Sequence, residues 1–404
     1  MSGPFPPGFL WGTATSAHQI EGNNTNSDWW AFEHSAHPLI REPSGDAADS
    51  YHRWGEDMDL LAAAGFTDYR FSIEWARIEP APGEFSAAHI DYYRRMVAGA
   101  LARGLRPLVT LHHFTHPLWF AERGGWVGDA AVDLFVRYVE AAAPILAEGV
   151  QHVCTINEPN IVSLFAAIRE QRLPSVDLRD ITPDPGTTDA LIEAHHAATV
   201  ALKARNSTLD VGWSIACLNV VADAGADDAA TDYARTRQTI FTEAAQGDDW
   251  VGVQAYTRTR IGLVDGRPVV VKPGSDVERT LTGWEYYPRA VGDAIREVRR
   301  TAVDVPIIVT ENGIATADDL RRIDYTKGAL ASVHDAMQDG ADVRGYFHWS
   351  LLDNYEWGSY GPTFGLVSVD RLTFARFPKP SLAWLGALAP AAHHDPKEDS
   401  SDGP

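Results

Sequence analysis

Eight short apolar runs recur along the chain, and segments with helical periodicity separate them. The runs are Phe9–Thr15, Asp68–Ile73, Arg106–His112, His152–Asn157, Val211–Ile215, Trp250–Gln254, Pro306–Glu311 and Arg344–Trp349. The run that ends at Glu311 is the clearest, because it is rich in β-branched residues and has no alternating polar positions. Such a pattern predicts a strand buried on both faces, as in a parallel sheet that helices cover.

The intervals between these runs carry helical patterns. The clearest are Asp57–Ala64, Ala87–Arg103, Ala131–Ala147, Thr188–Lys203 and Arg289–Arg300. Glycines such as Gly65 and Gly104 close several of them, as expected at helix C-termini. Strict alternation of strand and helix predicts parallel strands joined by crossovers, and eight such units predict a closed (β/α)8 barrel.

A doubly wound open sheet is the alternative fold. No GxGxxG or GxxxxGK[ST] loop follows the first run, so the phosphate-binding turn of that fold is missing. A barrel needs roughly 250 residues, which leaves the excess for long loops at its mouth. We therefore expect one catalytic domain over residues 1–390, followed by a polar tail over 391–404 that lacks periodicity and is predicted to be disordered.

Two of the runs end in a glutamate, Glu158 after VCTIN and Glu311 after PIIVT. In a barrel the C-terminal ends of all strands meet at one mouth, where such proteins place their chemistry. Two carboxylates there suit glycoside hydrolysis, in which one carboxylic acid protonates the leaving oxygen and the other carboxylate attacks or stabilises the anomeric carbon. A structural ion pair is the alternative for a single strand-end glutamate.

Other polar and aromatic residues gather at the predicted strand ends. They are His18, Gln19, Glu21, Arg70, His112, His113, Asn157, Tyr256, Trp349, Asp353, Asn354, Glu356 and Trp357. Amides, carboxylates and a histidine match the hydroxyl groups of a sugar, and indoles stack on its C–H faces. The strand-end chemistry therefore favours a carbohydrate ligand.

The histidines His112, His113 and His116 raise the alternative of a metal site. Adjacent strand residues point to opposite faces, and no carboxylate lies within a few positions to complete a ligand set. We expect neither a metal site nor a cofactor.

The charge and the cysteines limit the partners and the compartment. Acidic residues number 55 against 34 basic ones, a net charge of -21, which argues against nucleic-acid and anionic-membrane partners. Cys154 and Cys217 lie in apolar runs and are expected to be buried thiols without a disulfide framework. The N-terminus has no basic n-region or apolar h-region, and no run of 18 apolar residues occurs, so we expect a cytoplasmic protein. The oligomeric state stays open.

Six motifs resemble those of glycoside hydrolase family 1, the retaining β-glucosidases and β-galactosidases. They are FLWGTATSAHQIEG at Phe9, YRFSIEWARI at Tyr69, TLHHF at Thr110, TINEP at Thr155, VTENG at Val309 and WSLLDNYEW at Trp349. The resemblance implies a (β/α)8 barrel and a small-molecule β-glycoside substrate, with β-glucosidase as the expected activity. Galactosidase or fucosidase specificity, a transglycosidase and a sugar-binding pseudoenzyme are the alternatives, although the pseudoenzyme reading is disfavoured because both glutamates are present.

The resemblance also implies a role for each matching residue. Glu311 matches the nucleophile and Glu158 the acid/base, with carboxyl groups about 5 to 5.5 Å apart in a retaining enzyme. Arg70 and Tyr256 match neighbours of the nucleophile, and both would lower the pKa of Glu311. The implied sugar-binding residues are Gln19, His113, Asn157, Tyr256, Trp349, Glu356 and Trp357, and the peptide between Trp349 and Ser350 is expected to be cis.

Some positions depart from the family pattern. Phe114-Thr115 stands where Trp-Asp is common, and Gln254-Ala255 precedes Tyr256 where Asn-Tyr is usual. The stretch 216–249 is also shorter than is usual. Because these departures spare both glutamates and the sugar-binding positions, we expect a narrow sugar site and a permissive leaving-group site.

Overall fold

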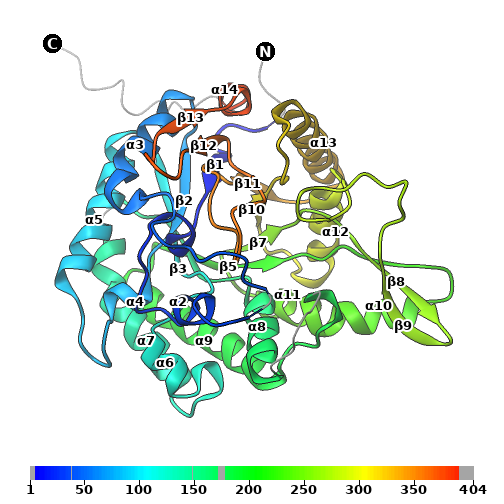
Figure 1. Cartoon of the computed structure of the whole chain (residues 1–404), viewed down its shortest axis with the longest axis horizontal. Coiled ribbons are helices and arrows are strands. Elements are labelled where there is room, and N and C mark those ends of the chain that lie inside the picture. The colour runs from blue at the N-terminus through cyan, green and yellow to red at the C-terminus, as the bar shows by residue number, and fades with distance from the viewer. Residues whose placement is uncertain (1–4, 38, 148, 172–177, 391–404) are drawn as a thin grey trace.

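Eight parallel strands close into a barrel, which confirms the predicted (β/α)8 fold. The structure is a computed structural model that describes residues 5–37, 39–147, 149–171 and 178–390. The barrel strands are β1 (Leu10–Ala14), β2 (Asp68–Ser72), β3 (Arg106–His112), β4 (His152–Asn157), β5 (Asp210–Ala216), β7 (Trp250–Gln254), β10 (Ile307–Asn312) and β11 (Val343–Trp349) (Figure 1). They pair in chain order, and β11 pairs with β1, so the open-sheet alternative is wrong.

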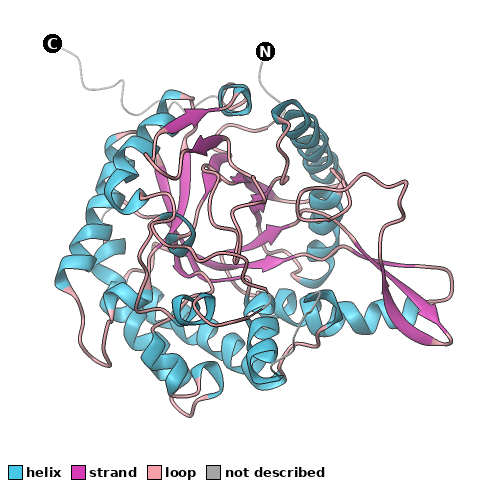
Figure 2. Ribbon diagram, in the orientation of Figure 1, coloured by secondary structure: helices cyan, strands magenta, loops and turns pink. Residues whose placement is uncertain are grey.

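Helices surround the barrel (Figure 2). The covering helices are α3 (Ser50–Ala63), α5 (Ala87–Ala102), α7 (Ala131–Ala142), α9 (Pro185–Arg205), α10 (Asp227–Ala234), α11 (Ile240–Ala244), α12 (Ala290–Thr301), α13 (Asp319–Gln338) and α14 (Pro380–Gly386). Further helices lie in the loops that follow β1 to β4, namely α1 (Ala17–Ile20), α2 (Asp28–Glu33), α4 (Trp75–Ile78), α6 (Leu118–Glu122) and α8 (Pro159–Gln171).

Both faces of the barrel strands are buried, which explains their continuous apolar sequences. Side chains such as Leu108, Trp250 and Phe347 pack inside the barrel, while Val211 and Ile295 belong to the larger cluster between strands and helices. Successive side chains of a strand point to opposite faces, so a strand covered on both sides needs apolar residues throughout. The two cysteines are free and buried, as predicted.

One predicted helix ends early. The pattern over Ala131–Ala147 predicts a single helix, whereas α7 ends at Ala142 and a 3-10 turn covers Ala143–Leu146. Pro144 lies within that turn, and a proline has no N–H for the helical ladder and clashes with the preceding turn. The prediction gave periodicity more weight than the proline.

Two small sheets were not predicted. Strands β6 (Val220–Ala222), β8 (Thr259–Val264) and β9 (Arg267–Val271) form one, and β12 (Val367–Val369) and β13 (Arg376–Pro378) form the other. The β8–β9 hairpin projects from the barrel and turns at Asp265-Gly266, where both φ angles are positive (Figure 2). An Asp-Gly pair between strand-forming residues is a hairpin signal that the sequence analysis missed.

The predicted disordered tail, 391–404, lies outside the described residues and stays a prediction. Within the described ranges, no helix combines the length and the apolar character that crossing a membrane requires.

Candidate active site

Both strand-end glutamates follow an irregularity in strand register. On β10 the register with β7 shifts between Val309 and Glu311, and on β4 the register with β5 shifts between Cys154 and Asn157. Irregularities of this kind re-aim the side chains that follow them. Glu158 then has a φ of 45°, and its N–H donates to the Ser214 carbonyl oxygen at 2.7 Å.

The chain leaves β10 beside the end of β11. A Cβ at Gly313 would lie 2.0 Å from the carbonyl oxygen of Trp349, so only glycine allows the two strand ends to approach this closely. The peptide between Trp349 and Ser350 is cis, as the family resemblance implies. This close approach places the residues after Trp349 next to those that follow Glu311.

Three donors hold the carboxylate of Glu311. Arg70 Nη1 donates to Oε1 at 2.6 Å, Gln254 Nε2 donates to the same oxygen at 2.8 Å, and Tyr256 Oη donates to Oε2 at 2.5 Å. Arg70 is wholly buried and Glu311 is 4% exposed, so water competes little for these contacts. The structure therefore places both implied neighbours, Arg70 and Tyr256, on Glu311.

Burial raises the pKa of Glu158 well above 4.5, and the negative charges of Glu311 and Glu356 add to that rise, while Arg70 opposes it. Burial also raises the pKa of Glu311, but Arg70, Tyr256 and Gln254 oppose it. The expectation that Arg70 and Tyr256 lower the pKa of Glu311 is confirmed for both groups, but burial outweighs them, and the pKa of Glu311 lies above its usual value. The two environments still differ, since only Glu311 has donors on both oxygens.

A second group of polar side chains surrounds Gln19. Its Nε2 donates to the Tyr355 carbonyl oxygen at 2.8 Å and to Asn354 Oδ1 at 3.0 Å, and lies 3.4 Å from Glu356 Oε2. Trp349 Nε1 donates to Glu356 Oε1 at 3.1 Å. Burial is the largest cause that raises the pKa of Glu356, to about 8.

Four aromatic rings form a nearly parallel series along this part of the site. The rings of His18 and Trp357 are 5.7 Å apart at 8°, those of Trp357 and His113 are 6.0 Å apart at 13°, and those of His113 and Trp349 are 5.9 Å apart at 20°. Burial lowers the pKa of His113 well below its usual value, so its imidazole is neutral. The series gives the site stacking surfaces of the kind that a sugar ring uses.

Asn157 joins the two groups. Its Oδ1 accepts from Arg70 Nη2 and from Gln254 Nε2, the latter at 2.8 Å, and its Nδ2 lies 3.2 Å from His113 Nε2. Glu311 and the sugar-binding candidates therefore form one continuous network of hydrogen bonds and ring contacts around the barrel mouth.

Several strand-end residues lie outside this network. Glu21 pairs with Arg77 and Tyr93, and Asp353 pairs with Lys379. Of the histidines considered for a metal, His112 and His116 stack on each other with ring centroids 5.9 Å apart. His116 lies near Asp28 and His112 against Trp126, and no set of three or more His, Cys, Asp or Glu side chains in the described part of the chain could hold a metal ion.

Sequence reasoning missed two participants. Gln254 enters the sequence analysis only as a departure from the family pattern, although it ends β7 and so lies at the same end of the barrel as the other strand-end residues. His18 is among the predicted strand-end residues, but the sequence gives no sign that its ring stacks on Trp357.

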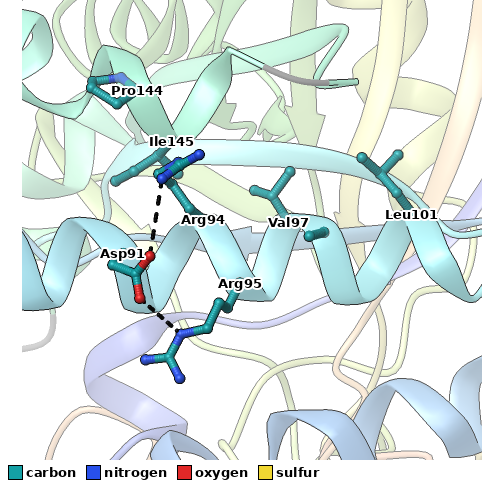
Figure 3. A pocket seen from close by; sticks show the side chains of 8 residues that line it. Asp91, Arg94, Arg95, Val97, Leu101, Pro144 and Ile145 are labelled. Carbon is teal, nitrogen blue, oxygen red and sulfur yellow. Dashed lines mark ion pairs between the residues drawn. The ribbon is translucent and has the colours of Figure 1, made fainter.

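A separate hollow lies on the flank of the barrel between α5 and the 3-10 turn Ala143–Leu146 (Figure 3). Its charged lining residues are Asp91, Arg94 and Arg95, and the Asp91 carboxylate pairs with Arg95 at 3.1 Å. Because these side chains are exposed and none belongs to the network above, the hollow is not part of the candidate site.

Two carboxylates in unlike environments at the mouth of a (β/α)8 barrel are the arrangement that glycoside hydrolases use. Within that class the chain belongs to glycosyl hydrolase family 1, whose sequence model matches residues 1–259 and 249–393.

Relatives of known sequence or structure agree with this assignment. The chain is 32% identical to β-glucosidase 6 of Oryza sativa subsp. japonica, over 96% of this chain and 90% of that one. It is 28% identical to β-glucosidase A of Thermotoga maritima, over 94% and 96%. Among solved structures, β-glycosidase BGL167 superposes with a TM-score of 0.87 at 42% identity, over 97% of this chain and all of that one.

Proposed function

We propose that this protein is a retaining β-glucosidase that hydrolyses a terminal, non-reducing β-D-glucosyl residue through a covalent glycosyl-enzyme intermediate. The single observation that carries the proposal is that the carboxyl groups of Glu158 and Glu311 have different surroundings. Glu311 has hydrogen-bond donors on both oxygens, whereas the carboxyl of Glu158, a residue of intermediate burial, is influenced by the negative charge of Glu311. The names of the relatives supply the β-glucoside part of the proposal.

In the first step, Glu311 attacks the anomeric carbon while Glu158 gives its proton to the leaving oxygen. The raised pKa of Glu158 favours the protonated form that this step requires. Formation of the ester removes the negative charge of Glu311, and with it one cause of the raised pKa of Glu158. Glu158 is then a better base, and it takes a proton from the water that cleaves the ester.

The residues around Gln19 supply the proposed sugar site. Gln19, His113, Asn157, Glu356 and Trp357 would bind hydroxyl groups, Trp349 would form the floor beneath the ring, and Tyr256 would contact the sugar beside Glu311. Each side chain has polar atoms or an aromatic face at the barrel mouth, where a sugar fits the mixed amide, carboxylate and indole surface. The permissive leaving-group site and the cytoplasmic location stay predictions.

Glu311 is expected to carry the label when the protein reacts with 2,4-dinitrophenyl 2-deoxy-2-fluoro-β-glucoside. The fluorine slows both steps, while the good leaving group keeps the first step faster than the second, so the intermediate accumulates. Intact mass should rise by one fluorosugar, and peptide mapping should place it on Glu311. A label on another residue, or none after complete inactivation, would contradict the nucleophile assignment.

The sugar preference has its own test. With 4-nitrophenyl leaving groups, kcat/KM for the β-glucoside should exceed that for the β-galactoside about tenfold or more, equivalent to roughly 1.4 kcal/mol of transition-state binding. The α-glucoside serves as the matched control and should not react. A higher value for the galactoside or fucoside would change the assigned sugar, and transfer products in place of free glucose would identify a transglycosidase.

A further inference from the structure

The side chain of Gln254 bonds to both Glu311 and Asn157. Its Nε2 donates to Glu311 Oε1 and to Asn157 Oδ1, each at 2.8 Å. Gln254 is 1% exposed, and its backbone is the register partner of Glu311 across β7 and β10. The contacts are therefore shielded from water and depend on the pairing of the two strands.

Arg70 donates to the same two oxygens. Its Nη1 bonds to Glu311 Oε1 at 2.6 Å, and its Nη2 bonds to Asn157 Oδ1. Donors and acceptors thus alternate around a closed ring of four side chains from β2, β4, β7 and β10. Loss of either donor, Arg70 or Gln254, would remove one of the two hydrogen bonds to Glu311 Oε1 and one of the two to Asn157 Oδ1.

The ring makes the two oxygens of Glu311 unequal. Oε1 accepts from both Arg70 and Gln254, whereas Oε2 accepts only from Tyr256 among the described residues, at 2.5 Å. A carboxylate oxygen offers about two lone-pair sites in its plane. Oε1 is therefore filled, and Oε2 keeps one site free.

The amide of Gln254 has one workable orientation. Exchanging its oxygen and nitrogen would direct Oε1 at two other oxygens, and electrostatic repulsion opposes that arrangement. In the observed orientation Gln254 Oε1 has no hydrogen-bond partner although it is buried. The orientation of the Gln254 amide is therefore determined by the two acceptors of its Nε2, and not by a hydrogen bond to its own oxygen.

We propose that Gln254 is a positioning residue that, with Arg70, anchors Glu311 through Oε1 and leaves Oε2 as the attacking atom. This inference rests on the proposed function. The free pair of Oε2 forms the bond to the anomeric carbon as the bond to the leaving oxygen breaks, and that oxygen takes the proton of Glu158. The same ring keeps Asn157 Oδ1 engaged, so the Asn157 amide N–H groups are turned toward His113 and the sugar site.

Gln254→Met tests the role, because it keeps the length of the side chain and removes the donor. Loss of a hydrogen bond to the ionised form should raise the pKa of Glu311 and move the acidic limb of kcat/KM upward by about one pH unit. Inactivation by the fluoroglucoside should slow about 10- to 100-fold, since a misplaced nucleophile loses near-attack geometry. Gln254→Asn keeps an amide and should fall between wild type and Gln254→Met.

Gln238→Met is the matched control. Gln238 is also 1% exposed, and its Oε1 accepts from the Leu218 N–H, so its loss costs a buried hydrogen bond without a contact to Glu311. Thermal unfolding should be measured for every variant, and Gln254→Asn carries the test if Gln254→Met does not fold. An acidic limb and an inactivation rate no more altered than in Gln238→Met would overturn the positioning role.

The two proposals fail separately. Absence of β-glucoside hydrolysis by the wild-type protein would end the proposed function, and a fluorosugar label away from Glu311 would end the nucleophile assignment. A label on Glu311 together with an unshifted pH profile in the Gln254 variants would end only the inference about Gln254.

Discussion

Replacing Glu311 with alanine is expected to lower kcat/KM for 4-nitrophenyl β-glucoside by about 10⁵- to 10⁶-fold. A loss of this size is typical when a covalent nucleophile is removed. The variant lacks the group that attacks the anomeric carbon, and nothing else among the contacts of Arg70 and Tyr256 replaces it. Azide is a small anion that should bind in the space left by the Glu311 side chain, attack the anomeric carbon and so restore turnover. The product should be the α-glycosyl azide, because azide then attacks from the face that Glu311 occupies.

In Glu311→Ala, a loss of activity caused by a less stable fold must be distinguished from one caused by the missing nucleophile. Arg70 is wholly buried, and removal of a buried ionic partner costs about 3 to 5 kcal/mol in favourable geometries. Glu74→Gln is a suitable control, since Glu74 is also buried and bonds to Thr115 and to the Ala76 N–H without contacting Glu311. A folded Glu311→Ala protein with ordinary activity, or rescue that yields the β-azide, would remove Glu311 from the nucleophile role.

Replacing Glu158 with alanine should have an effect that depends on the leaving group. For alkyl glucosides kcat/KM should fall about 10²- to 10⁴-fold, because a poor leaving group needs the proton. For 2,4-dinitrophenyl glucoside kcat/KM should change little, since that leaving group departs unprotonated. The second step loses its base, so a rapid burst followed by slow turnover is expected with the dinitrophenyl substrate.

Azide distinguishes this variant from the first. With Glu158→Ala it should react with the covalent intermediate from the open face and give the β-glycosyl azide, the opposite anomer from Glu311→Ala. Stopped-flow absorbance measures the burst, and NMR of the product assigns the anomer. Equal losses on alkyl and dinitrophenyl glucosides would mean that Glu158 is not the acid.

The barrel was predictable because its strands are buried on both faces. Burial of this kind removes polar residues from the whole strand, so a run such as Ile307–Val309 is visible in the sequence without knowledge of its neighbours. The mouth follows from the topology, since parallel strands bring their C-terminal ends to one side. Helix limits are less certain, as the stop near Pro144 illustrates, because periodicity and a single proline compete.

The network at the mouth was predictable only in part. Glu158 and Glu311 could be found because each one ends an apolar run. The double contact of Gln254 depends on a register shift in β10 and on the reach of an amide, and neither is written in local sequence. The net pKa of Glu311 likewise depends on how much solvent the assembled loops exclude, which the sequence does not give, although it identified the lowering effect of Arg70 and Tyr256.

The β8–β9 hairpin offers a place to modify the protein without disturbing the barrel. The hairpin projects away from the barrel (Figure 2), and the two residues of its turn, Asp265 and Gly266, are exposed. Exposed loop tips tolerate inserted residues better than paired strands do. A short peptide introduced there could tether the enzyme to a solid support with its mouth left open to substrate, whereas a one-residue insertion in β4 or β10 would turn a glutamate away from its partners.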